Sequence, residues 1–125
     1  MQLKGLKAVF LGDSITCGSG ASSPDKVYWA ALGANTGLIT RGYAVGGTRI
    51  ARQRTPSANE KHDLDFNMRM YDMDKDADIV GVFGGTNDYG HGDAPIGGID
   101  DDSVYTFYGA LNCLYKYLIE TYPKA

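Results

Sequence analysis

The chain has 125 residues, of which 43% are hydrophobic and 22% are charged, with a net charge of -3. This length fits one domain, and the composition excludes a disordered chain. There is no basic footprint for nucleic acid, no signal-peptide core and no apolar run long enough to span a membrane. We therefore expect a cytoplasmic protein without nucleic-acid or membrane partners.

The first half of the chain predicts strand, helix and strand. Residues 7–11 form an apolar run that is too short for a helix and lacks polar alternation, which indicates a strand buried on both faces. A helix is expected from the N-cap Ser23, with Pro24 at its first position, to about Gly37. Residues 38–45 predict the second strand, and a polar, irregular segment follows.

The second half of the chain repeats this alternation. Residues 62–75 fit both strand and helical spacing, and we prefer one helix because a parallel strand pair needs a crossover. Residues 78–83 predict the third strand, followed by a glycine-rich loop to about residue 100. The last helix is expected to begin near Asp102 and to bury a stripe of leucines. Alternating strands and helices predict an α/β fold with a parallel sheet.

Each predicted strand is followed by residues suited to catalysis. Asp13 and Ser14 follow the first strand, Gly46 and Gly47 follow the second, and Asn87 follows the third. Because ligands bind beyond the carboxyl ends of the strands in open α/β sheets, these three loops should meet. A serine at a helix start presents its hydroxyl beside unpaired backbone N–H groups. A glycine N–H and an asparagine amide can add further donors for a developing oxyanion.

Together the three loops resemble the sequence blocks of the SGNH, or GDSL-like, hydrolases. The matching segments are Gly-Asp-Ser-Ile-Thr at 12–16, Gly-Gly-Thr at 46–48 and Gly-Thr-Asn-Asp at 85–88. The resemblance implies a serine esterase with Ser14 as nucleophile, whose oxyanion is bound by Gly47, Asn87 and the Ser14 N–H. It also implies a small acyl or acetyl ester as substrate and no metal or organic cofactor. The implied fold is a flavodoxin-like three-layer sandwich, here with strand order 2-1-3 and helices on both faces.

The resemblance covers only the front part of the family's domain. Residues 1–125 are predicted to be this N-terminal part, because no Asp-x-x-His block, which would supply the general base, follows the last helix. A serine without a base is a weak nucleophile, so we expect little turnover by this chain alone. A non-catalytic binding module and a half-enzyme completed by another chain stay open as alternatives. The exposed third strand would suit a homo-oligomer.

Three further residues are assigned to the pocket. Asp13 is expected to bond nearby backbone N–H groups, Gly46 is the alternative to Gly47 for the oxyanion N–H, and His91 is expected on a loop beside the substrate. The segment from Asp88 to His91 matches Asp-x-x-His. We do not expect it to act as the catalytic pair, because Asp88 already belongs to the third block.

The remaining histidine and the arginines give weaker signals. His62 is expected to be solvent-exposed near a helix start. Arg49, Arg52 and Arg54 could either steer an anionic substrate or pair with the acidic turns.

Overall fold

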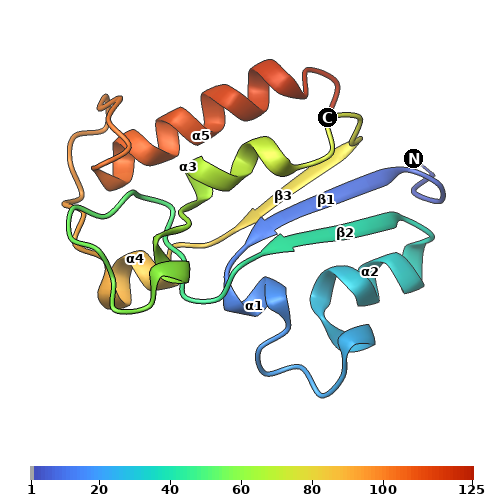
Figure 1. Ribbon diagram of the computed structural model, residues 1–125. Helices are drawn as coiled ribbons and strands as arrows, with labels where there is room; N and C mark the ends of the chain where they lie inside the picture. The colour runs from blue at the N-terminus through green and yellow to red at the C-terminus, as the bar shows by residue number, and fades with distance from the viewer. Residues whose placement is uncertain (1) are drawn as a thin grey trace.

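A computed structural model describes residues 2–125 as a small parallel sheet with helices packed around it (Figure 1). The strands are β1 (Lys7–Gly12), β2 (Ile39–Ala44) and β3 (Ile79–Phe83). They form a three-stranded sheet in the order β2-β1-β3, and both strand pairs are parallel. The predicted α/β fold with strand order 2-1-3 is confirmed.

Helices cover both faces of the sheet, as Figure 1 shows. Helices α1 (Ser14–Cys17) and α2 (Tyr28–Thr36) lie on one face. Helices α3 (Phe66–Arg69) and α5 (Phe107–Thr121) lie on the other, and α4 (Thr86–His91) lies beyond the carboxyl ends of the strands. The three layers leave the strand ends as the place where loops from all three strands converge.

The central strand β1 feeds two hydrophobic cores, because successive side chains of a strand point to opposite faces. Val9 and Leu11 belong to the larger core, which lies against α3 and α5. Ala8 and Phe10 belong to the smaller core, which lies against α2. Val9, Leu11 and Ala8 have no exposed surface. The apolar run without polar alternation therefore reflects burial on both sides.

Helix α2 begins later than predicted. Ser23 precedes only a 3₁₀ turn at Pro24–Lys26, and its side chain makes no capping hydrogen bond. Val27 then adopts an extended conformation (φ -62°, ψ 138°), so the regular helix starts at Tyr28. The predicted end is correct, since Gly37 is left-handed (φ 79°) and its N–H donates to the carbonyl of Gly33.

The single helix predicted over residues 62–75 is wrong. The segment consists of a 3₁₀ turn at Glu60–Asp63, helix α3 and a second 3₁₀ turn at Met70–Asp72. Asp65 is the N-cap of α3 and accepts a hydrogen bond from the N–H of Met68 at 2.9 Å. Capping and burial of the short pieces outweigh the helical periodicity that the sequence shows.

The glycine-rich loop after β3 contains a helix that the sequence does not signal. Helix α4 follows Gly85, which has φ 112°, a conformation that glycine tolerates. Gly, Asn and Asp are poor helix formers, so propensity argues against this element. The Asp88 carboxylate ties it to a distant segment by accepting from the N–H groups of Ile50 at 2.9 Å and Ala51 at 3.0 Å.

Helix α5 begins at Phe107 instead of near Asp102. Its N-cap is Thr106, whose hydroxyl accepts from the N–H of Gly109 at 3.1 Å. The acidic run before it shapes the preceding loop, since Asp101 accepts from the Thr106 hydroxyl at 3.0 Å. The capping chemistry therefore acts four residues later than expected.

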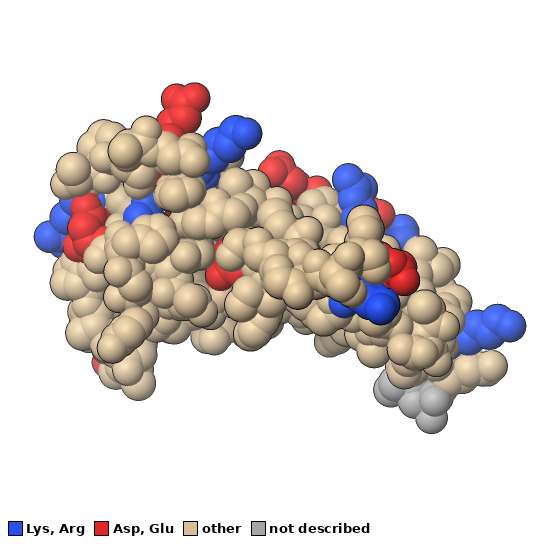
Figure 2. Space-filling model, turned by 90° about the horizontal axis from the view of Figure 1, so that it is seen from below, with Lys and Arg blue, Asp and Glu red and all other residues tan. Residues whose placement is uncertain are grey.

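The surface carries charges of both signs. Figure 2 views the molecule from the side on which α1 and α2 lie, and there Lys and Arg are interspersed with Asp and Glu. Within residues 2–125, no helix is long and apolar enough to cross a membrane.

Leu114 lies at the centre of the larger core with no exposed surface, so it tests the packing of α5 on the sheet. We expect Leu114→Ala to lower the free energy of unfolding by about 2–5 kcal/mol, because it removes buried methyl groups and leaves a cavity. Ile119→Ala is the matched control on the same helix, since Ile119 is 72% exposed, and it should change stability by at most about 0.5 kcal/mol. Urea denaturation measures both, and equal losses would contradict this packing.

Candidate active site

The loop after β1 places Ser14 at the first position of α1. Asp13, only 2% exposed, is the N-cap and accepts from the N–H of Ile15 at 3.1 Å. Ser14 is half-buried, and no hydrogen bond joins its hydroxyl to another residue of the described chain, 2–125. The predicted strand-to-helix turn is present, and Asp13 bonds a backbone N–H as expected.

The two glycines after β2 lie beside this turn. A Cβ added to Gly46 would lie 3.7 Å from the Cβ of Ser14, which places Gly46 directly against the serine. Gly47 has φ 76° and therefore occupies the left-handed region. The backbone N–H groups of Ser14 and Gly47 donate to no backbone carbonyl within residues 2–125. Both donors are thus available to a ligand.

Asn87, in the first turn of α4, joins the loops of all three strands. Its Nδ2 donates to the carbonyl of Thr48 at 2.9 Å and faces Oδ2 of Asp13 at 3.4 Å. The first contact is an ordinary hydrogen bond, whereas the second is longer than the usual range. These contacts confirm the prediction that the loops after the three strands meet.

The Asp88 to His91 segment does not form a catalytic pair. Both carboxylate oxygens of Asp88 accept backbone N–H groups from residues 50 and 51. Burial raises the pKa of the Asp88 carboxyl above its usual value, and these backbone hydrogen bonds oppose the rise. The His91 ring instead contacts Asn87 through Nε2 at 3.0 Å and Arg49 through Nδ1 at 2.9 Å. His91 therefore lies beside the site without touching Ser14.

His62 is closer to the site than the sequence suggests. It is half-buried, and a Cβ added to Gly47 would overlap its imidazole. Its ring centroid lies 5.7 Å from that of His91, so the two histidines flank the loop after β2. The expectation that His62 is a solvent-exposed residue is wrong. No local pattern marks it, because its partner Gly47 lies in a distant segment.

Arg69 is a buried cation beneath the strand ends, and sequence reasoning missed it. It is 7% exposed, and its Nη2 donates to the carbonyl of Gly12 at 3.0 Å and to the hydroxyl of Thr48 at 2.9 Å. Its Nη1 and Nε donate to the carbonyls of Tyr43 at 3.3 Å and Leu64 at 2.8 Å. Burial lowers the pKa of Arg69. This one side chain links the ends of β1 and β2.

Two of the arginines after β2 pair with acidic side chains. Arg49 lies 3.0 Å from Asp63, and Arg52 lies 3.0 Å from Asp65. Hydrogen bonds from Ser57, and then the charge of Arg49, lower the pKa of Asp63. Of the two alternatives for these arginines, pairing with acidic residues is the one the structure shows for Arg49 and Arg52.

No group of three or more His, Cys, Asp or Glu side chains is arranged to hold a metal ion within the described part of the chain. A serine hydroxyl near backbone N–H donors is the combination of groups that nucleophilic acyl chemistry uses.

Comparisons with known proteins relate this arrangement to hydrolases. Residues 10–125 match the model of the GDSL-like lipase/acylhydrolase family. One crystal structure is 28% identical with a TM-score of 0.82, covering 100% of this chain and 56% of the other. A protein from Lactobacillus plantarum is 31% identical with a TM-score of 0.74, covering 100% of this chain and 54% of the other. The chain thus spans about half the length of these two relatives.

A third structure supports the fold alone. It comes from Bacteroides ovatus ATCC 8483 and is described as a GDSL-like lipase, 23% identical with a TM-score of 0.62. The match covers 97% of this chain and 70% of the other. A comparison with curated proteins found no match.

Gly47 can be tested by a single added methyl group. Gly47→Ala should lower the free energy of unfolding by about 1–2 kcal/mol, because a Cβ is strained at φ 76°. Overlap with the His62 imidazole adds to that loss. Gly46→Ala is the control, since its Cβ would make only an ordinary contact at 3.7 Å. Urea denaturation measures both variants. If Gly46→Ala lowers the free energy of unfolding as much as Gly47→Ala does, the left-handed conformation of Gly47 and its contact with His62 are contradicted.

Proposed function

This chain belongs to the GDSL-like lipase/acylhydrolase family, and on that premise we propose that it hydrolyses a small acyl or acetyl ester through Ser14. One observation carries the proposal. The loops after β1, β2 and β3 are in contact, because Gly46 lies against Ser14 and the Asn87 amide donates to the carbonyl of Thr48 and faces Asp13, which supports a site made of Ser14, Gly47 and Asn87. A nucleophile with donors around it is the arrangement that acyl transfer requires.

In the proposed mechanism, the hydroxyl oxygen of Ser14 attacks the acyl carbon as a general base accepts its proton. The negative charge that forms on the carbonyl oxygen is held by the N–H groups of Ser14 and Gly47 and by the Asn87 amide. The alcohol leaves with a proton returned by the base, and water then releases the acyl group from the serine.

The Asn87 amide has one N–H to offer. The N–H that donates to Thr48 at 2.9 Å holds the side chain in place. The other N–H faces Asp13 only at 3.4 Å, so a bound oxyanion can replace this weak contact. Asp13 faces the Asn87 amide and Gly46 lies against Ser14, which supports a role for both in shaping the pocket.

The general base is proposed to be a histidine outside residues 2–125. The nitrogens of His91 are occupied by Asn87 and Arg49, and His62 packs against Gly47. This chain covers 56% and 54% of the two relatives, so each relative has further residues that could supply such a group. The base would come either from a longer form of this protein or from a partner chain.

Hydrolysis of p-nitrophenyl acetate by residues 1–125, beside Ser14→Ala, tests this assignment. We expect no difference between the two, because an unassisted serine is a weak nucleophile. A chimera that adds the C-terminal part of the Lactobacillus plantarum relative should be active and should lose at least about 10³-fold on Ser14→Ala. Activity of the chimera that survives Ser14→Ala would refute the nucleophile. Ser14-dependent activity of the chain alone would refute an external base.

We also propose that the free edge of β3 pairs with a second copy of the chain. Among the described residues β3 pairs only with β1, and Phe83 at its end is 50% exposed. Unpaired strand edges are templates for association, and a lysine on the edge opposes it.

Analytical ultracentrifugation over a concentration series should show a dimer that Phe83→Lys weakens. Ile39→Lys is the matched control, because Ile39 is 59% exposed on the other outer strand. A monomer at all concentrations, or equal weakening by both variants, would count against pairing through β3.

A further inference from the structure

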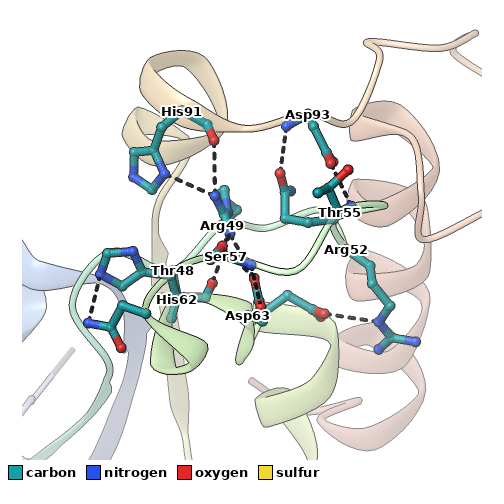
Figure 3. Close-up of polar contacts among 12 residues, drawn as sticks. Thr48, Arg49, Arg52, Thr55, Ser57, His62, Asp63, His91 and Asp93 are labelled. Carbon is teal, nitrogen blue, oxygen red and sulfur yellow. Dashed lines mark hydrogen bonds and ion pairs between the residues drawn. The ribbon is translucent and has the colours of Figure 1, made fainter.

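Arg49 is a buried cation at the rim that the proposed mechanism does not use. The residue is 3% exposed, although arginine is rarely buried without a structural reason. Its Nη1 lies 2.9 Å from Nδ1 of His91 and donates to the His91 carbonyl at 3.0 Å (Figure 3). Two contacts from one nitrogen fix both the ring and the backbone of His91.

The other side of the guanidinium is held just as firmly. Nη2 donates to the hydroxyl of Ser57 at 2.6 Å, to Oδ1 of Asp63 at 3.0 Å and to the carbonyl of His62 at 3.3 Å. Figure 3 shows Arg49 between His91 on one side and Ser57, His62 and Asp63 on the other. A planar group with partners on both sides has little freedom to turn.

The contact between Arg49 and His91 determines where the histidine carries its proton. A guanidinium has five N–H donors and no acceptor, so Nδ1 of His91 must offer a lone pair. In a neutral ring the proton is then on Nε2. Nε2 lies 3.0 Å from Oδ1 of Asn87, an oxygen that accepts this proton's hydrogen bond. The ring is therefore an acceptor toward Arg49 and a donor toward Asn87.

This polarity acts together with the Thr48 carbonyl to set the orientation of the Asn87 amide. The oxygen and nitrogen of the amide are similar in shape, so only hydrogen bonds distinguish the two orientations. The observed orientation matches Oδ1 with the His91 N–H and Nδ2 with the carbonyl of Thr48. The reversed amide would place oxygen against the Thr48 carbonyl and N–H against N–H at His91. Both of those contacts are repulsive.

We propose that Arg49 and His91 are positioning residues that keep the N–H groups of Asn87 turned toward the acyl-binding site. The inference rests on the proposed function only for the use of that amide in holding an oxyanion. The order of action is Arg49, then His91, then Asn87: the contact with Arg49 fixes the direction of the His91 hydrogen bond, which acts on the Asn87 amide together with the Thr48 carbonyl. His91 is not the general base in this arrangement, because its basic nitrogen already accepts from Arg49.

The protonation state of His91 can be measured without any turnover. Long-range ¹H–¹⁵N correlation spectra of the uniformly labelled chain, at neutral pH, distinguish the two neutral tautomers and the cation. We expect the His91 proton on Nε2 and a bare Nδ1. A ring with its proton on Nδ1, or a cationic ring, would overturn the proposal. His62 provides an internal comparison, since its Nε2 has only a 3.4 Å contact with Asn59.

Two substitutions of His91 separate positioning from mere packing. His91→Gln keeps one acceptor and one donor, whereas His91→Phe keeps a ring and removes both. His91 is exposed, so both variants should fold. In His91→Phe the Asn87 side-chain amide should exchange with solvent about tenfold faster, because a hydrogen bond that holds it is lost. His91→Gln should retain the slow exchange. Equal exchange rates in the two variants would overturn the proposed chain of hydrogen bonds from Arg49 through His91 to Asn87, which we call the relay.

The same pair tests function in the form that hydrolyses p-nitrophenyl acetate through Ser14. His91→Phe should lower kcat up to about 10²-fold with KM little changed, and His91→Gln should restore most of it. Combined with Asn87→Ala, His91→Phe should cause no further loss, because it acts through that amide. Additive losses would overturn the relay. Absence of Ser14-dependent activity would refute the proposed function and leave the spectroscopic result to decide the relay.

Discussion

The site depends on how the carbonyl groups at the ends of β1 and β2 are paired once they are buried. A buried carbonyl without a partner is costly, and the chain there leaves the sheet before its ladder can satisfy it. The Arg69 guanidinium donates to the carbonyls of Gly12 and Tyr43 and also to the hydroxyl of Thr48. Removing it would take a donor away from each of these three groups at the ends of β1 and β2. The rim is therefore built on a buried cation.

A second set of contacts joins the loop after β3 to that rim. Asp88 accepts the N–H groups of Ile50 and Ala51, and Asn87 donates to the Thr48 carbonyl. Two neighbouring residues of α4, Asn87 and Asp88, thus hold the segment after β2 in place, in addition to Arg69. Donors held in place before a substrate arrives need no reorganisation as charge develops, which is the physical basis of oxyanion stabilisation.

The arrangement separates two parts of the proposed catalysis. The proposed nucleophile and its proposed donors lie on the loops after the three strands, and the two relatives have chains about twice as long as this one. Within residues 2–125, β1 is buried on both faces, by α2 on one side and by α3 and α5 on the other. Arg49 and His91 then serve the donors and not the nucleophile, which accounts for two ionisable side chains at a rim where neither touches Ser14.

The sequence by itself determined the three strands, their order through a family resemblance, and the three loops that meet. Strands and glycine turns are signalled locally, and the rule that parallel strand ends share one edge needs no further contacts. Tertiary structure alone decided the broken helix over residues 60–72, the helix α4 and the placement of His62. It also decided that Arg49 and Arg69 are buried. Each of these depends on partners far along the chain, so no local pattern could specify it.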